Sequence, residues 1–358
     1  MDFCRSSDRR PICAGNSMTV SVLIAAKNEA GATASTIDSI VHAGVSVVDI
    51  YLVSDGSTDA TAEIARSLGV NVLALPTNGG KAVAIAKGIE HFGLLGRYSL
   101  LAIADADTTF ESKYFAEMLL AFERNPNAAI ACGRVKSRRK NWLTAWRALQ
   151  YATAHWLIKE GQQVLGVINV AAGCCSVFRT NTFTQIWASE PSIVEDMFAT
   201  LRAHYLGFGV VYVRDAVVIT ADPQDLIKSY TRQLLRWNRG AWTCTRQFRM
   251  WGSTRKIALE TQMVMGEGLV FSTILLLAPL WFFLWPRLAV MWLEIDTFCL
   301  FVSALIVSII QRRGDILFYM PSYILLRFVD AGLFVKSFCQ AFFGQKRTEL
   351  SWFSATRY

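Results

Sequence analysis

The sequence predicts an α/β fold with a mostly parallel sheet, followed by a helical region at a membrane. Apolar, β-branched segments alternate four times with helix-patterned segments between residues 20 and 107, as in strand–helix–strand crossovers. The long apolar runs lie after residue 264, and a stretch rich in basic and aromatic residues precedes them. These observations divide the chain into a globular front, an interface segment and an apolar end.

Each predicted strand of the front part is an apolar run that stops at a polar turn. The strands are predicted over residues 20–26, 47–53, 70–75, 100–107 and 128–132, and the helices over 32–43, 58–68 and 81–91. After residue 132 the pattern is less regular. A stripe of Trp142, Trp146, Leu149 and Trp156 on one helical face indicates either core packing or a membrane-interface helix.

The predicted strand that starts at residue 100 ends in two carboxylates, Asp105 and Asp107, separated by one alanine. Side chains alternate along an extended chain, so residues two apart share a face, here at the carboxyl edge where α/β sheets bind ligands. Two adjacent like charges need a cation, and Mg²⁺ or Mn²⁺ with a diphosphate suits such oxygen ligands. The alternative is a strand-end turn without a metal.

Further polar residues are expected at the same edge of the sheet. Asp55 ends the second strand, and Lys81 follows Gly79 and Gly80 after the third. Acids for a metal, ribose or base, together with a cation near phosphate, are what a nucleotide-diphosphate site requires. The sequence contains neither GxxxxGK[ST] nor GxGxxG, so a P-loop ATPase and a dinucleotide-binding fingerprint are not supported.

Three later segments add candidates. The small residues at 171–176, including Cys174 and Cys175, either let the backbone approach a ligand or form a packing turn. Glu195 and Asp196 open a predicted helix, where acids also simply complement the helix dipole. Gln233, Arg236 and Trp237 share a helical face. They could bind phosphate and stack a sugar ring, or belong to a basic surface helix.

The net charge of +8 is concentrated between residues 224 and 256, which hold eight basic residues and one acid. Tryptophan and phenylalanine residues interleave with them, and this mixture favours an anionic membrane surface over nucleic acid. The eight cysteines and four histidines show no metal-ligand spacing, which predicts a reducing compartment without a zinc site or disulfide framework.

The apolar end contains segments that could cross a membrane. Residues 268–285 and 288–310 are long enough to span. Residues 316–343 contain charges and are re-entrant, interfacial or a third crossing. We expect a polar segment at 1–18, a catalytic domain at 19–223, interface helices at 224–263, membrane helices at 264–345 and a tail at 346–358. Residues 1–18 contain no apolar stretch of signal-peptide length, so we expect the first 250 residues to stay in the cytosol. This predicts an integral protein of the inner or plasma membrane with a cytosolic catalytic domain.

In chain order, these pieces resemble the processive family 2 glycosyltransferases, which include cellulose, chitin, hyaluronan and poly-β-1,6-N-acetylglucosamine synthases. The resemblance runs from about residue 19 to 251. It rests on Asp55 in SDGSTD, Asn78–Gly–Gly–Lys81, Asp105–Ala–Asp107, GCCSVFR from Gly173, Glu195–Asp196 and Gln233–x–x–Arg236–Trp237. It implies a GT-A fold and a nucleotide-diphosphate-sugar donor, usually UDP-linked.

Residue by residue, the resemblance implies a division of labour. Asp55, Asp105, Lys81 and Arg236 would bind the nucleotide-sugar, and Asp107 would bind the Mg²⁺ or Mn²⁺ ion. Asp196 would be the general base of an inverting transfer. The acceptor would contact Glu195, Gln233, Trp237, Cys174 and Cys175.

One departure leaves the product open. Relatives that export polymer usually also carry transmembrane helices before the catalytic domain, and none is found here. Either an oligomer or an export partner completes a channel, or the product is short or lipid-linked. The expected partners are therefore a UDP-sugar, a glycan or lipid-linked acceptor and membrane lipid, without nucleic acid. The alternative enzyme transfers one sugar to a polyprenyl phosphate, and the alternative class is an inactive nucleotide-binding scaffold.

Overall fold

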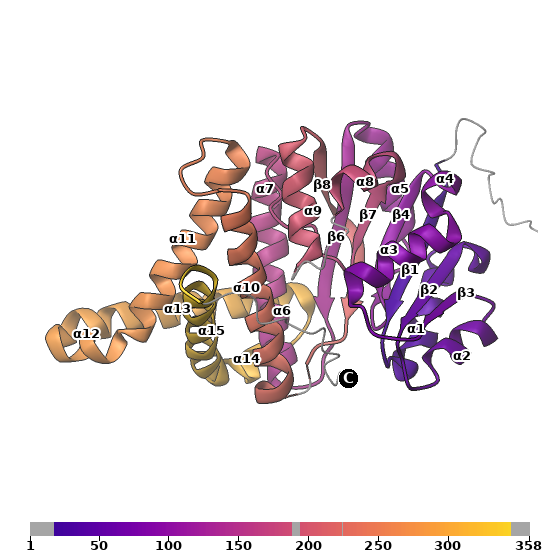
Figure 1. The fold of residues 1–358 in the computed structure, drawn as a ribbon. Helices are drawn as coiled ribbons and strands as arrows, with labels where there is room; N and C mark the ends of the chain where they lie inside the picture. Colours follow the sequence, from indigo (N-terminus) through magenta and orange to yellow (C-terminus); the bar gives the residue numbers. More distant parts are fainter. Residues whose placement is uncertain (1–17, 188–193, 224, 345–358) are drawn as a thin grey trace, which may run out of the picture.

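The computed structural model describes residues 18–187, 194–223 and 225–344, and its centre is one eight-stranded sheet (Figure 1). The strand order is β3-β2-β1-β4-β7-β6-β8-β5. The strands are β1 (Val20–Ala26), β2 (Ile50–Asp55), β3 (Asn71–Leu75), β4 (Leu100–Asp105), β5 (Thr109–Phe110), β6 (Ala128–Ser137), β7 (Ser176–Arg179) and β8 (Gly209–Thr220).

The sheet is parallel from β3 to β4 and mixed beyond it. Strand β7 runs antiparallel to both β4 and β6, so β6 is parallel to β4, and β8 is parallel to β6. The carboxyl ends of β1, β2, β4, β6 and β8 therefore meet at one edge. The α/β class is confirmed, and so are the predicted strands of the front half, except that Val47–Asp49 form a 3-10 helix and the second strand begins at Ile50. Strands β5, β7 and β8 are additional findings.

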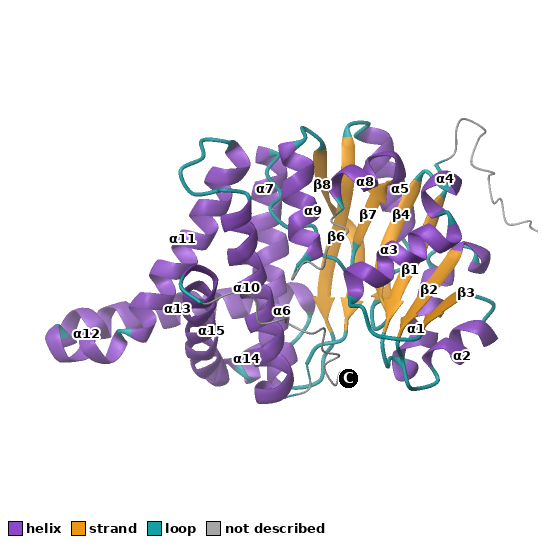
Figure 2. Cartoon of the chain, in the orientation of Figure 1, coloured by secondary structure: helices purple, strands orange, loops and turns teal. Residues whose placement is uncertain are grey.

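Helices cover both faces of this sheet (Figure 2). On one face, Val22 and Ile24 pack with Ile40 of α1 and Phe122 of α5, and on the other Leu23 packs with residues of α3, α8 and α9. Neighbouring strand residues thus face opposite layers, as strand alternation requires. The helices of this part are α1 (Ala30–His42), α2 (Thr61–Ser67), α3 (Lys81–Phe92), α4 (Leu94–Arg97), α5 (Tyr114–Arg124), α8 (Thr180–Ile186) and α9 (Glu195–Tyr205).

A second group of helices lies beside the end of the sheet that carries β6 and β8 (Figure 1). Its members are α6 (Trp142–Thr153), α7 (Lys159–Leu165), α10 (Thr231–Gln247), α11 (Lys256–Leu276), α12 (Ala278–Leu284), α13 (Pro286–Gln311), α14 (Asp315–Phe318) and α15 (Met320–Phe342). Trp146 and Leu149 of the tryptophan stripe are buried in a core shared with Tyr323 and Leu326 of α15. Core packing therefore explains this stripe.

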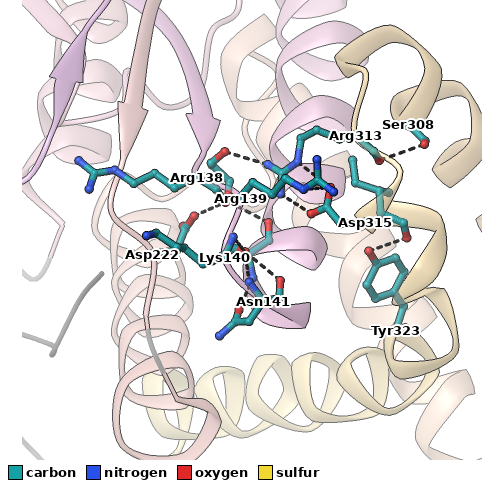
Figure 3. Close-up of polar contacts among 12 residues, drawn as sticks. Arg138, Arg139, Lys140, Asn141, Asp222, Ser308, Arg313, Asp315 and Tyr323 are labelled. Carbon is teal, nitrogen blue, oxygen red and sulfur yellow. Dashed lines mark hydrogen bonds and ion pairs between the residues drawn. The ribbon is translucent and has the colours of Figure 1, made fainter.

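A buried arginine joins these helices to the sheet edge (Figure 3). Arg313, in the turn after α13, donates through Nη1 to the Ser137 carbonyl at the end of β6 (2.8 Å). Its Nη2 is 2.7 Å from the carboxylate of Asp315, which also lies 3.4 Å from Arg139. Because the guanidinium is buried, this contact fixes α14 against the end of the sheet.

Among the described helices, α13 alone is by itself long and apolar enough to cross a membrane, with a mean hydropathy of 2.1 in its best window. The predicted span 268–285 is not one straight helix, because α11 and α12 meet at a bend of 57° and could count together as a second span. Helix α15 carries Arg327, Asp330 and Lys336 and does not qualify. The predicted segment 1–18, apart from Met18, and the predicted tail 346–358 lie outside the described residues.

Candidate functional site

Four charged side chains meet at the carboxyl edge of the sheet, around Lys81 at the start of α3. The Lys81 Nζ atom lies 2.6 Å from Oδ1 of Asp105 and 3.3 Å from Oε1 of Glu195. It also donates to the Gly173 carbonyl at 3.4 Å. Burial alone would lower the pKa of Lys81, but the charges of Asp105 and Glu195 outweigh it and raise that pKa. The Lys81 side chain therefore stays protonated and positively charged.

Asp196, in the first turn of α9, is the fourth member. Its Oδ2 accepts a hydrogen bond from the Gly173 amide (3.1 Å) and its Oδ1 from the Met197 amide (2.7 Å). Burial and the neighbouring Glu195 raise the pKa of Asp196, against the opposite effect of Lys81 and the two amides. A carboxylate with a raised pKa is a stronger proton acceptor than an exposed aspartate.

The small residues at 171–176 form a turn that places backbone against these charges. A Cβ atom at Gly173 would lie 3.2 Å from Lys81 Nζ and 3.5 Å from Asp196 Oδ2, so the glycine permits the close approach. Cys175 is fully buried and its thiol donates to the Gly133 carbonyl at 3.4 Å. Because the Cys175 side chain is not accessible, it cannot contact an acceptor, and that prediction was wrong. Cys174 is only partly buried and remains a candidate.

Asp55 is completely buried at the end of β2. Its two carboxylate oxygens accept from the Gly79 and Gly80 amides, each at 2.8 Å. Gly80 has φ +89°, a conformation that favours glycine. Asp55 therefore fixes the conformation of the glycine loop that directly precedes Lys81. Its predicted contact with the nucleotide remains a prediction.

Asp105 and Asp107 do not share a strand face, because β4 ends at Asp105 and Asp107 lies in the following turn. That argument from alternation was wrong. The Asp105 side chain is 30% exposed, whereas residue Asp107 is 2% exposed.

The carboxylates of Asp105 and Asp107 offer the oxygen donors that Mg²⁺ and Mn²⁺ prefer. The described residues contain no group of three or more His, Cys, Asp or Glu that could hold a metal, so ligand and water oxygens would have to complete the coordination shell.

Helix α10 brings the predicted acceptor residues towards α9. A Cβ atom at Gly240 would lie 2.5 Å from the side chain of Val194, so glycine lets α10 pack directly against the residue before Glu195. Gln233, Arg236 and Trp237 are all partly buried on this helix. The Gln233 Oε1 atom accepts from Nη2 of Arg147 (2.8 Å), and the Arg147 guanidinium lies 4.9 Å from the Trp237 ring centroid.

Arg147 is a contact of the site that the sequence analysis did not single out. It is 3% exposed and comes from α6. Its signal in the sequence is a cation inside the tryptophan stripe, next to Trp146. A buried arginine needs polar or aromatic partners, but the spacing alone does not say which helix supplies them.

The comparisons with known proteins agree with this geometry. The family model named glycosyltransferase like family 2 matches residues 17–240. A poly-β-1,6-N-acetyl-D-glucosamine synthase of Staphylococcus epidermidis is 26% identical over 262 residues, covering 71% of this chain and 62% of that protein. Its namesake in Staphylococcus aureus (strain MSSA476) is 25% identical over 228 residues, covering 62% and 54%. This chain thus spans a little over half the length of these curated relatives.

A solved structure supports the fold. The mannosyltransferase from Pyrobaculum calidifontis, in complex with GDP-Man and Mn²⁺, matches with a TM-score of 0.60 and 12% identity, covering 92% of this chain and 88% of that one. At this identity the likeness concerns the fold. The family match covers more than half of the chain and includes Lys81, Asp105, Glu195 and Asp196. The chain therefore belongs to glycosyltransferase family 2 and is a glycosyltransferase.

Proposed function

We propose that this glycosyltransferase is an inverting hexosyltransferase that moves a sugar from a UDP-linked donor to a growing β-linked polysaccharide. The observation that carries the proposal is the cluster of Lys81, Asp105, Glu195 and Asp196 at the carboxyl edge of the sheet. It combines the cation of Lys81, the partly exposed carboxylate of Asp105 and the partly buried carboxylate of Asp196, whose pKa is raised. The polysaccharide product is taken from the names of the curated relatives.

In the proposed reaction Asp196 acts as general base. Its carboxylate takes the proton from an acceptor hydroxyl while that oxygen forms a bond to the anomeric carbon of the donor sugar. The bond from the anomeric carbon to the diphosphate breaks on the opposite side, and UDP leaves with the bonding electrons. The single displacement inverts the configuration. The Gly173 and Met197 amides hold the carboxylate in place.

The donor would be held by residues on β2, α3, β4 and α10 and in the turn after β4. Asp107 is the candidate ligand for Mg²⁺ or Mn²⁺, which when bound neutralises charge on the diphosphate. Asp105, Asp55 and Lys81 are assigned to the nucleotide-sugar, and Arg236 to the departing diphosphate. Glu195, Gln233, Trp237 and Cys174 are assigned to the acceptor, on the side where α10 packs against α9.

The proposed location is the inner or plasma membrane, with the catalytic domain in the cytosol. Helix α13 is apolar enough to span, and only 17% of its window is buried. Exposed apolar side chains continue onto α12, where Phe283 is 83% exposed, and α12 projects away from the sheet (Figure 1). Such a surface favours lipid contact. A second copy or an export partner completing a channel belongs to the same proposal.

The experiment is to purify the full chain in a lipid nanodisc and offer a panel of UDP-sugars with Mg²⁺ or Mn²⁺. UDP release and product length are measured with added oligosaccharide. We expect one donor to give products longer than the acceptor by several sugars. Absence of transfer from every donor would overturn the enzymatic proposal. A product longer by a single sugar on polyprenyl phosphate would replace it with the alternative of lipid glycosylation.

A further inference from the structure

Arg147 contacts two aromatic rings, those of Tyr230 and Trp237, in the segment that also carries Gln233. Its guanidinium carbon is 4.6 Å from the ring centroid of Tyr230 and 4.9 Å from that of Trp237. Tyr230 ends the π turn Leu226–Tyr230, which leads directly into α10. A guanidinium over an aromatic face is attracted to it, so these two contacts favour one orientation of each ring.

The same guanidinium determines which way the Gln233 amide points. Nη2 of Arg147 is 2.8 Å from Oε1 of Gln233. An arginine has five N–H donors and no acceptor, so only the oxygen of the amide can face it. The NH₂ group of Gln233 must therefore point away from Arg147. Since Gln233 is only partly buried, this group is available as a hydrogen-bond donor.

Helix α15 stabilises the surroundings of Arg147 through Asp330. Asp330 of α15 accepts hydrogen bonds from the Tyr230 hydroxyl (2.7 Å), Trp146 Nε1 (3.0 Å) and Gln150 Nε2 (2.8 Å). Trp146 and Gln150 lie near Arg147 on α6, and Tyr230 is the fully buried ring that Arg147 contacts. Helices α6, α10 and α15 thus meet around one buried cation and one carboxylate.

We propose that Arg147 is a positioning residue for acceptor binding: it sets the Trp237 ring plane and turns the Gln233 NH₂ group towards an oxygen of the acceptor sugar. This inference rests on the proposed function, which assigns Gln233 and Trp237 to the acceptor. Arg147 itself is 3% exposed and does not touch the sugar. The acceptor group at this point must be a hydrogen-bond acceptor, such as a hydroxyl or N-acetyl oxygen.

The test compares Arg147→Met, Arg147→Lys and Gln233→Glu with the unchanged chain in nanodiscs. UDP-N-acetylglucosamine and a β-1,6-linked N-acetylglucosamine pentamer serve as probes, because the curated relatives are named for that polymer. Arg147→Met is expected to raise the KM for the pentamer at least tenfold and to leave the KM for the donor within twofold. Arg147→Lys keeps the charge but not the planar fork, and we expect an intermediate rise.

Gln233→Glu separates positioning from general stability. A glutamate still accepts from Arg147, so the fold is retained, but it replaces the NH₂ donor by an oxygen. We expect the KM for the pentamer to rise at least tenfold without loss of Tm. The double variant Arg147→Met with Gln233→Glu is expected to be little worse than the poorer single variant, because both act on the same group.

Arg179→Met is the matched control. Arg179 also stacks on an aromatic ring, with its guanidinium 5.0 Å from Phe122, and donates to the Ala128 and Phe122 carbonyls. It pairs with Leu100 at the start of β4, at the opposite edge of the sheet from Asp105. Its loss is expected to lower Tm without changing the KM for the pentamer.

The outcomes are distinguishable. If the unchanged chain transfers no sugar from any UDP-sugar of the panel, the proposed function and this inference fall together. If it transfers sugar but the Arg147 variants and Gln233→Glu keep the original KM for the pentamer, only the inference is overturned. A rise confined to the donor KM also overturns it. Should Arg147→Met fail to fold, Arg147→Lys and Gln233→Glu carry the test.

Discussion

The Lys81 cluster and the Arg147 cluster are each built around one cation, and their surroundings differ. Lys81 lies among the carboxylates of Asp105 and Glu195 at the ends of secondary-structure elements, and the Asp105 side chain is 30% exposed. Arg147 lies among aromatic rings and amides between helices, and it is 3% exposed. An ion pair that is partly open can exchange partners with an arriving ligand. A buried cation such as Arg147 is not accessible to a ligand, so it can only fix the positions of its neighbours.

The difference indicates a division between chemistry and positioning. At the Lys81 cluster, neighbouring acids shift pKa values, and proton transfer depends on such shifts. At the Arg147 cluster, rings and amides fix orientation, and sugar binding depends on orientation. Changes at the first cluster should therefore lower turnover or donor binding, and changes at the second should weaken acceptor binding.

The largest effect is expected for Asp196→Asn. An asparagine keeps the shape but cannot take a proton, so kcat should fall about 10²- to 10⁴-fold, the usual contribution of a general base. UDP binding, measured by calorimetry, should be retained. Asp215→Asn, at an exposed position of β8, is the control and should leave kcat unchanged. A near-normal kcat in Asp196→Asn would remove the base assignment and with it the proposed division.

Asp107→Asn tests the metal assignment in the donor half of the proposed site. Loss of one carboxylate ligand should weaken metal-dependent UDP binding at least about tenfold, as measured by titration with Mn²⁺ and again after chelation. The exposed Asp38→Asn serves as the control. Equal binding of UDP with and without Mn²⁺ in the unchanged chain would contradict the metal assignment.

A pH profile distinguishes the two clusters further. A general base works only when ionised, so kcat/KM should rise with pH through the pKa of Asp196, which burial and Glu195 raise above the ordinary aspartate range. Lys81 lowers this pKa. Lys81→Met should therefore raise the pKa of Asp196 further and move the acid limb of the profile to higher pH. Below that limb, kcat/KM should fall about tenfold for each unit by which the pKa rises.

Lys81→Arg provides the matched control because it keeps the positive charge. Its acid limb should stay close to that of the unchanged chain. An acid limb near pH 4 in the unchanged chain, or no movement in Lys81→Met, would show that Asp196 does not control the profile. Variants of Arg147 should leave the limb in place, since Arg147 acts on orientation.

The smallest effect is expected for Asp330→Asn on α15. It removes the charged acceptor of three hydrogen bonds, so Tyr230 loses its fixed position behind Arg147. We expect a rise in acceptor KM of about fivefold, equivalent to about 1 kcal/mol, together with a lower Tm. Asp315→Asn, which weakens the buried pair with Arg313, should lower Tm alone. Equal acceptor KM values in both variants would exclude a role for α15 in positioning.

The sequence predicted the front half of the sheet because each strand there is a plain apolar run ending in a polar turn. It also placed Lys81, Asp105 and Asp196 as candidates, since acids and a cation at strand ends and helix starts converge by topology. It did not predict the positions of Asp107 and Cys175. Whether β4 continues past Asp105, and which of two adjacent cysteines enters the core, depends on packing with neighbouring strands.

By itself the sequence determined the α/β class, the chemistry gathered at the sheet edge and the apolar end of the chain, because these follow from periodicity and residue type. Only the tertiary structure decided that α11 and α12 bend by 57°, that Asp55 holds a glycine loop, and that Arg147 faces Gln233 and Trp237. The reason is physical. The Arg147 contact joins residues 86 positions apart, and local pattern carries no information on which helices meet.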